Sequence, residues 1–561
     1  AYMFHVATSF NSPLNSWNVS NVVNMEGTFY VASAFNQNLN SWNTSKVTNL
    51  RRTFERASAF NGDITTWNTA LVNDLHRTFA DALVFNQNIG GWNVANVEWM
   101  EATFGGAALF NQSLNSWNTS KVMGMVCTFC YASAFNGNIT SWDTSKVTMM
   151  SGMFQRATVF NQNISGWDVS KVVDFSSMFD YAVAFNQPIG SWNVGSAQTM
   201  AAMFIHATLF NQTLSSWDVA DVTNFNWMFE TSGFNQPINA WTVSSATSME
   251  GMFKNTTFNQ PLASWTVSNV TTMSAMFENS PFNQDISSWS TGNLEKANHM
   301  FYLNTAFNQP IGSWNVSKLT EAVAMFRGAT SFSRPLNTWN VSALIKAEAM
   351  FMNTLMFNQP LNNWQVGNVT TMQSMFEGSA FNQNISTWNT SKVETMGWMF
   401  KNATNYDQPM AWDVSKVKVM VAMFESTPLN QDLSAWNTSS VEDMGWMFAH
   451  TDFFNSDITG WDTSKVYYFR SMFEDALAFN QNIGLWNVTA ATVMIDMLRY
   501  TSSMSRANYD ALLIGWAAQN VHSNVTFDAN NYQYSAGAAA TARGVLTGAK
   551  GWTIVDSGVG P

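Results

Sequence analysis

Charged side chains are scarce in this chain, because only 11% of its 561 residues are Asp, Glu, Lys or Arg. The net charge is −12, from 25 basic and 37 acidic residues, and the Lys and Arg residues form no basic run. Nucleic acids and anionic membrane surfaces attract clustered basic residues, so we expect neither as a partner. The chain also lacks an apolar stretch near the roughly eighteen residues of a membrane span, so we expect no membrane insertion. A weakly charged, acidic surface fits secretion better.

Cysteine is equally scarce, with Cys127 and Cys130 as the only two. Two cysteines cannot build a disulfide framework, and a zinc site would need further ligands that six scattered histidines do not offer at a matching spacing. The pair is interpreted as two small apolar fillers or one local disulfide, with a redox pair as the less favoured alternative. We therefore expect no metal site and no cofactor.

Aromatic residues and methionine are abundant instead, with 26 Trp, 43 Phe and 34 Met, which excludes intrinsic disorder. Twenty of the tryptophans, from Trp17 to Trp486, are spaced 24 or 25 residues apart. A period in this range is typical of a solenoid and excludes a row of separate globular domains. We predict a buried tryptophan column, represented by Trp17, Trp42, Trp142, Trp192, Trp314, Trp388 and Trp486.

Each repeat predicts a short strand followed by a helical turn. The residue two after the repeat tryptophan is Val or Thr in every copy, and the residue between them is polar. This alternation predicts a β-strand in which Trp42 and Thr44 point inward and Ser41 and Asn43 point outward. Further on, apolar residues recur at spacings of three and four, which suits one helical or 3₁₀ turn. The expected fold class is an α/β solenoid, a right-handed leucine-rich-repeat-like coil stack with a parallel sheet on one face and short helical turns on the other.

Most repeats end with Phe-Asn-Gln, often followed by proline, which predicts a turn back toward the next strand. We expect the Phe to anchor this turn and the Asn to bond neighbouring backbone. The repeats fill residues 1–504. Residues 505–561 lack the motif, are patterned as helix, strand, helix, strand, and are predicted to form an α/β cap over the exposed end of the core.

The repeat pattern resembles that of the BspA-like leucine-rich-repeat surface proteins, with the 25-residue repeat of mycoplasma lipoproteins. The resemblance rests on motifs such as LNSWNVSNVVNMEGTF at 14–29 and ITSWDTSKVTMMSGMFQRATVFNQ at 139–162, and it covers residues 1–504. Residues 508–556 are similar to the tail that often closes such arrays. Single repeats depart from the pattern, for example at Ser333-Arg334. The resemblance implies a leucine-rich-repeat-type solenoid, an extracellular or cell-surface location, roles in adhesion or surface structure, and no catalysis.

The residue after each repeat tryptophan forms an exposed polar column, and many of these asparagines begin an Asn-x-Ser/Thr sequon. A glycan there could project without disturbing the core, whereas sequons in the Phe-Asn-Gln turn are poorer acceptors. The candidate N-glycosylation sites are Asn18, Asn43, Asn118, Asn138, Asn163, Asn315, Asn340, Asn384, Asn389, Asn437 and Asn487.

We expect a non-catalytic extracellular structural or surface protein, because the repeats are nearly identical and no catalytic motif emerges. Met3, Phe4, Ala7 and Phe10 already match the repeat, so the amino end enters in mid-copy with an apolar face. This suggests a head-to-tail homopolymer, a glycosylated filament or matrix. The alternative is a cell-surface adhesin that binds glycans or surface proteins through the solenoid face, and an ice-binding array is the least favoured possibility.

Overall fold

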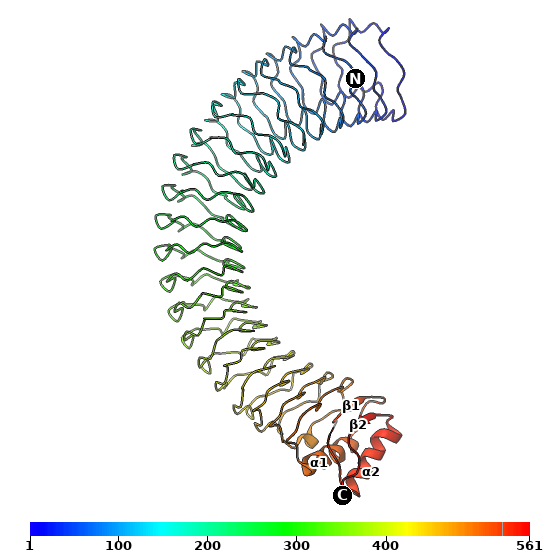
Figure 1. Cartoon of the computed structure of the whole chain (residues 1–561), viewed down its shortest axis with the longest axis vertical. Coiled ribbons are helices and arrows are strands. Elements are labelled where there is room, and N and C mark those ends of the chain that lie inside the picture. Colours follow the sequence, from blue (N-terminus) through cyan, green and yellow to red (C-terminus); the bar gives the residue numbers. More distant parts are fainter. Residues whose placement is uncertain (530) are drawn as a thin grey trace. The chain divides into compact units, whose positions relative to one another are not determined.

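The computed structural model describes residues 1–529 and 531–561, which divide into two compact units, Ala1–Gln284 and Asp285–Pro561. Within each unit the chain runs as a succession of coils, one for each sequence repeat (Figure 1). Among the described residues, helix is confined to the short 3₁₀ helix η1 (Ile483–Leu485) and the C-terminal segment. The coils themselves are therefore built from turns and extended connections.

Neighbouring coils pair in parallel at the residue just before the first methionine-type position of each repeat. Single bridges join Asn24 to Asn49 and Asn49 to Asp74, and equivalent bridges recur in both units. The pairing continues through every second amide, because the N–H of Met25 donates to the Asn49 carbonyl at 3.0 Å and the N–H of Phe29 donates to the Thr53 carbonyl at 2.8 Å. We call residues 24–31 and their equivalents the bridge segment.

The amides between these inter-coil bonds close turns within the coil. The N–H of Thr28 donates to the Met25 carbonyl, and the N–H of Ala32 donates to the Phe29 carbonyl, at 3.1 and 3.0 Å. The third residue of each turn, Gly27 or Val31, has a positive φ of 57° or 58°. Type II turns require this conformation at their third position, and glycine adopts it without steric cost.

The predicted helical turn at this place is wrong. A spacing of three and four also arises from consecutive turns closed by N–H(i+3)···O=C(i) bonds, so the apolar pattern does not distinguish the two structures. Because alternate amides of the bridge segment bond to the next coil, the segment satisfies its backbone without a helix.

The predicted strand at the tryptophan is also wrong, although its inward and outward residues are correct. Trp42 and Thr44 are buried, and Ser41 and Asn43 are exposed. Turns occur here instead, closed by bonds such as that from the Trp42 N–H to the Leu39 carbonyl at 3.0 Å. The parallel pairing therefore lies at the bridge segment and not at the tryptophan, where in-out alternation arises from the connections between turns.

Side chains hold the tryptophan side of adjacent coils together. The indole Nε1 of Trp42 donates to the Leu14 carbonyl of the preceding coil at 2.9 Å, and the Thr44 hydroxyl donates to the Asn68 carbonyl of the following coil at 3.0 Å. Consecutive indoles lie nearly parallel, as in the pair Trp42 and Trp67, whose centroids are 6.2 Å apart. Each coil therefore needs its neighbours both for burial and for hydrogen bonds.

Six of the seven tryptophans predicted in the core are buried, with exposed fractions of 0–5%; they are Trp42, Trp142, Trp192, Trp314, Trp388 and Trp486. Trp17 is 39% exposed, so its assignment to the core is wrong. It belongs to the first coil of the chain as given, where no preceding coil covers its ring.

The Phe-Asn-Gln turns form a second side-chain ladder. The side-chain oxygen of Asn61 accepts hydrogen bonds from the Asn86 N–H at 2.9 Å and from the Gln87 side chain at 3.2 Å. Phe60 is fully buried beneath this turn. The expectation that the Asn bonds neighbouring backbone is confirmed.

The C-terminal segment contains α1 (Arg506–Ala517), β1 (Thr526–Asp528), α2 (Ala538–Gly544) continued by the π-helix η2 (Val545–Ala549), and β2 (Thr553–Val555). The predicted order of helix, strand, helix, strand is confirmed. The strands β1 and β2 pair in parallel. The boundary at residue 504 stays a prediction, as does the capping role.

The segment reproduces the bonds that a further coil would make. The indole Nε1 of Trp516, on α1, donates to the Ile483 carbonyl at 3.2 Å, as the core tryptophans do to the preceding coil. The Asn508 amide donates to the carbonyl and side-chain oxygens of Asn480 at 2.8 Å, in place of the ladder glutamine. A bridge from Met494 to Phe527 of β1 continues the pairing at the bridge segment.

Candidate functional site

All eleven asparagines proposed as glycosylation sites are exposed. In each, the side-chain oxygen accepts a hydrogen bond of 2.9–3.2 Å from the backbone N–H two residues further on, which belongs to the Ser or Thr of the sequon. This is an Asx turn, and it leaves the side-chain nitrogen directed away from the bonded backbone. Two sequons outside this set differ, because the side-chain nitrogens of Asn269 and Asn368 donate to the Ser244 and Ser342 carbonyls at 2.8 Å.

Aspartates take the place of asparagine in several coils of this column. Hydrogen bonds from Ser145 hold the pKa of Asp143 below its usual range, and hydrogen bonds from Ser170 do the same for Asp168. These carboxylates therefore stay ionised and solvated. Among the described residues, no group of three or more His, Cys, Asp or Glu side chains is placed to hold a metal ion.

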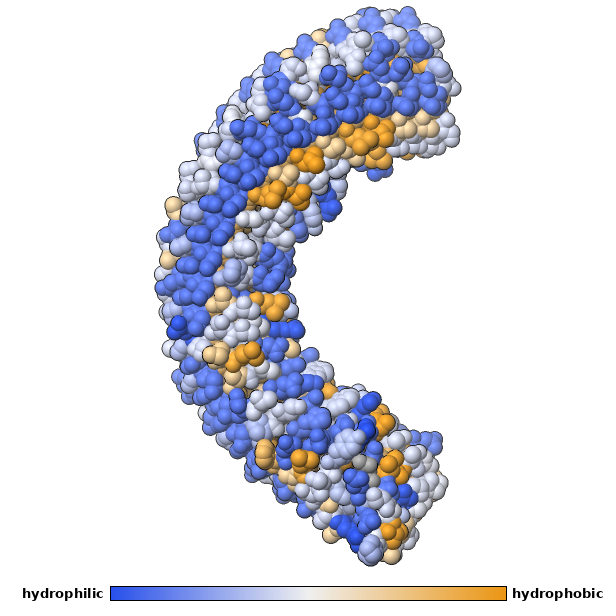
Figure 2. Space-filling model, viewed as in Figure 1, coloured by the Kyte–Doolittle hydropathy of each residue, from blue (hydrophilic) through white to orange (hydrophobic). Residues whose placement is uncertain are grey.

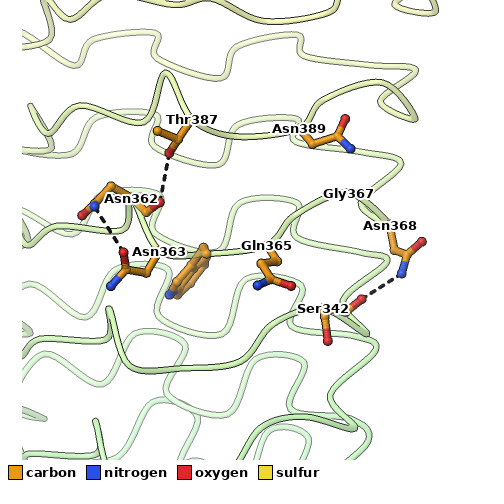
Figure 3. A pocket seen from close by; sticks show the side chains of 9 residues that line it. Ser342, Asn362, Asn363, Gln365, Gly367, Asn368, Thr387 and Asn389 are labelled. Atoms are coloured by element: carbon orange, nitrogen blue, oxygen red, sulfur yellow. Dashed lines mark hydrogen bonds between the residues drawn. The ribbon is translucent and has the colours of Figure 1, made fainter.

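A polar hollow of about 470 Å³ opens on the tryptophan side of the C-terminal unit (Figure 3). It lies beside Gln365 and Gly367, where the equivalent residues of the preceding coil are Asn340 and Ser342. Its polar groups bond mainly to one another and to the backbone, for example the Thr387 hydroxyl to the Asn362 carbonyl at 2.9 Å. The hollow is therefore a gap in a regular polar surface and not a cluster of reactive groups.

The opposite surface is formed by the bridge segment, and we call it the bridge face. The side chains that follow its phenylalanine are partly or fully buried. The position directly after the buried phenylalanine differs strongly from coil to coil there. In the N-terminal unit it is occupied by Tyr30, Glu55, Ala80, Gly105, Cys130, Gln155, Asp180, Ile205, Glu230, Lys254 and Glu278. In the C-terminal unit it is occupied by Tyr302, Arg327, Met352, Glu377, Lys401, Glu425, Ala449, Glu474 and Arg499.

The bridge face was not predicted from the sequence, because the polar column beside the tryptophans gives no sign of it. The variation stands next to a phenylalanine that nearly every coil carries, so an alignment of the copies at that phenylalanine would have found it. A second signal in the sequence is the recurrence of small residues such as Gly27 and Gly152 at one position of the bridge segment, where the backbone has a positive φ. The surface on which the coils differ is the better candidate for a functional site.

A row of stacked aromatic and basic side chains follows the bridge face of the N-terminal unit. The Arg156 guanidinium lies 5.4 Å from the Tyr131 ring centroid and 4.6 Å from that of Tyr181, and His206 stacks on Tyr181 at 3.9 Å. Asp180 lies beside this row, where burial raises the pKa of its carboxyl, and it accepts a 2.7 Å bond from the Gln155 amide. Each member comes from a different coil, so the coil spacing sets the geometry of the row.

Ion pairs link other coils across the same face. The buried carboxylate of Glu55 lies between Arg52 at 2.5 Å and Arg77 at 3.0 Å. In the C-terminal unit, the Lys401 ammonium lies 2.8 Å from the Glu425 carboxylate. These pairs fix long side chains in place.

An apolar hollow of about 480 Å³ interrupts the bridge face of the N-terminal unit. It exists because three successive coils carry the small residues Ala80, Gly105 and Cys130 at the variable position. Cys127 and Cys130 form a disulfide in its wall, in agreement with one of the alternatives for this pair, and the redox alternative stays a prediction. Of the residues that line it, Tyr131 and Met149 are 50% and 44% exposed. Figure 2 shows hydrophobic residues gathered on the surface of this unit.

No helix among the described residues combines the length and apolar character needed to cross a bilayer. No curated protein and no solved structure matches this chain. A family model described as "Mycoplasma protein of unknown function, DUF285" matches it in overlapping segments, at residues 1–87, 40–137, 102–214, 188–281, 255–359, 336–428 and 410–512. These matches cover most of the chain and agree with its repeat organisation, so the chain belongs to the DUF285 family.

Proposed function

We propose that this protein is a non-catalytic surface protein that binds a macromolecular partner through its bridge face. The observation that carries the proposal is the contrast between the two faces of the coils. The tryptophan side repeats the same polar residues, whereas the bridge face changes from coil to coil above an unchanged core. Repeat proteins use such a scaffold to present extended binding surfaces.

The proposal includes an extracellular or cell-surface location and a leucine-rich-repeat-like solenoid. Its support is the resemblance of the repeat to BspA-like surface proteins, together with the low charge of the chain. Catalysis is not part of the proposal. The acidic side chains described above are bonded to neighbouring backbone, paired with Lys and Arg or, for Asp180, bonded to the Gln155 amide, whereas acid–base catalysis needs several such groups converging in one cleft.

A second candidate is the structural polymer, a glycosylated head-to-tail filament. The uniform tryptophan side favours it, because eleven exposed sequons there adopt the same turn. In such a filament the contact would use the outer surface of the C-terminal segment, since Trp516 and Asn508 already occupy the bonding groups of the last coil.

The test compares binding by two surface variants of the full chain. One replaces Tyr131, Arg156, Tyr181, His206, Trp398 and Trp446 of the bridge face by Ser, and the matched control replaces exposed residues after six repeat tryptophans by Ser. Both proteins and the wild type are applied to a glycan array and to a panel of purified extracellular matrix proteins. We expect the wild type and the control to bind the same ligand and the bridge-face variant to lose at least tenfold in affinity. Equal binding by the bridge-face variant, or loss in the control alone, would refute the proposal.

A further inference from the structure

Two tryptophans with a small residue between them form a slot on the bridge face of the C-terminal unit. Trp398 and Trp446 occupy equivalent positions two coils apart, and Ala422 occupies that position in the coil between them. The three residues line a hollow of about 250 Å³ together with Val421, Lys401 and Glu425. We propose that this slot binds one pyranose ring of a neutral glycan. The proposal rests on the proposed function, because it places a glycan ligand on the bridge face.

The backbone places the two indoles in a conformation that bulky residues seldom adopt. Trp398, Ala422 and Trp446 have positive φ values of 58°, 51° and 55°. Most other coils carry Gly, Ala or Ser at this position, for example Ser374 and Ser471. Trp398 and Trp446 are only partly exposed, so most of each indole is already packed against the coils and the remaining surface is what a ligand can cover.

The width of the slot follows from the coil spacing. The Trp398 N–H donates to the Val421 carbonyl and the Ala422 N–H to the Gly445 carbonyl, both at 2.8 Å, so these three coils are paired as adjacent strands are. Two such steps put the tryptophan backbones roughly 10 Å apart. A flat aromatic ring needs roughly 7 Å between two walls, because carbon contacts are optimal near 3.5 Å. A puckered sugar ring is thicker and fills the slot better.

Contacts on the far side of Trp446 fix its ring. The Arg470 guanidinium lies 5.4 Å from its ring centroid, and Tyr468 packs against it at 5.9 Å. The indole is therefore held from one side while its other side faces the slot. A wall that is already positioned loses little conformational entropy when a ligand stacks on it.

The charged pair at the edge of the slot selects the ligand class. The Lys401 ammonium donates to the Glu425 carboxylate at 2.8 Å, so a donor and an acceptor stand side by side there. The ammonium opposes a cationic ligand between the indoles, and the carboxylate opposes an anionic one. Sugar hydroxyls can donate to Glu425 and accept from Lys401, while the apolar face of the ring stacks on tryptophan.

The test uses saturation-transfer NMR with the full chain and five probes. Three are neutral trisaccharides (maltotriose, cellotriose and triacetylchitotriose), and two are N-acetyltryptophanamide and tetramethylammonium. The decisive variant is Ala422→Trp, which fills the slot at a backbone position where both neighbouring coils of the column tolerate Trp. Trp398→Ala and Trp446→Ala each remove one wall. The matched control is Trp227→Ala, which removes a half-buried indole at the same position of another coil, where Gly251 follows and Ala275 replaces the second tryptophan.

We expect at least one trisaccharide to bind the wild type and Trp227→Ala equally, and to bind the three slot variants at least tenfold more weakly. Absence of trisaccharide binding, or binding unchanged in Ala422→Trp, would overturn the proposal. Binding of only the indole amide or the ammonium ion would also overturn it, in favour of a protein or cationic ligand. Ala422→Trp and the bridge-face variant are also compared for binding to the glycan array and to the matrix proteins. If Ala422→Trp still binds and the bridge-face variant does not, the slot proposal is overturned and the proposed function stands.

Discussion

Replacement of Trp314 by Ala tests the central feature of the coil stack. The Trp314 ring lies between Trp289 and Trp339, with centroids 6.2 and 6.4 Å away, and its Nε1 donates to the Ile286 carbonyl at 3.1 Å. The side chain is only 3% exposed. The substitution therefore removes a buried ring and a hydrogen bond to the preceding coil at once.

Both losses contribute to the expected destabilisation. Truncation of a buried Trp to Ala costs about 3–5 kcal/mol through lost contacts and the remaining cavity. The Ile286 carbonyl loses its indole donor but still accepts from the Trp289 N–H at 3.2 Å, so the lost hydrogen bond adds about 0.5–1.5 kcal/mol. We expect a local loss of about 5 kcal/mol. Trp314→Phe keeps a ring in the column but loses the N–H donor, so we expect an intermediate loss of about 2–3 kcal/mol.

Hydrogen exchange followed by mass spectrometry measures this loss coil by coil. Because each coil bonds mainly to its neighbours, peptides covering residues 286–339 should exchange faster in Trp314→Ala by about three and a half orders of magnitude. Peptides covering 436–470 of the same unit should change little. Uniform acceleration throughout the unit would refute the nearest-neighbour reasoning, and unchanged exchange at 286–339 would refute the structural role of the tryptophan column.

Three further predictions concern single positions. Thr144→Val should cost about 1 kcal/mol in thermal unfolding, because it removes the hydrogen bond from the Thr144 hydroxyl to the Asp168 carbonyl at 2.8 Å, while many other coils carry Val at this buried position; a much larger loss would mean that this bond to the next coil is essential. Burial raises the pKa of Asp180 above its ordinary 3.8, so the folded protein holds this proton at pH values where the unfolded chain has lost it. Lowering the pH through that window should therefore remove the destabilising contribution of Asp180 alone. Asp180→Asn should stabilise the fold at pH 7, and its advantage over the wild type should shrink in unfolding curves recorded down to pH 3.5; a difference between the two proteins that does not change with pH would contradict the assignment. If the chain is expressed through an N-glycosylating secretory pathway, peptide mapping after enzymatic deglycosylation should find glycans among the eleven exposed Asx-turn sequons and none at Asn269 or Asn368, whose side-chain nitrogens are engaged; the reverse pattern would contradict this role of the turn.

The sequence predicted the features that depend on residue burial and on turn-forming residues. The tryptophan period set the coil length, and the polar and apolar residues around Trp42 correctly gave its inward and outward sides. The helices and strands after residue 505 were predictable because they are regular elements with local hydrophobic patterns. These features require no knowledge of how neighbouring backbones pair.

The location of the backbone pairing was not predictable in this way. Turns stacked across coils produce the same spacings as a helix, and the bonds that distinguish them connect residues about 25 positions apart. The clue was steric, since glycine recurs at positions such as Gly27 and Gly251, where φ is positive. The slot between Trp398 and Trp446 depends on this same pairing, because only the coil register brings residues 48 positions apart to face each other.

The C-terminal segment makes the same hydrogen bonds to the last coil as a further coil would make. This affects how the number of repeats can change during evolution. Since Trp516 and Asn508 engage groups that every repeat presents to its successor, any repeat could stand in last place beneath the segment. If unequal recombination adds or deletes whole repeats, the C-terminal segment can then still bond to the last repeat of each product. The number of repeats can therefore differ between related proteins. The set of side chains on the bridge face would differ with it.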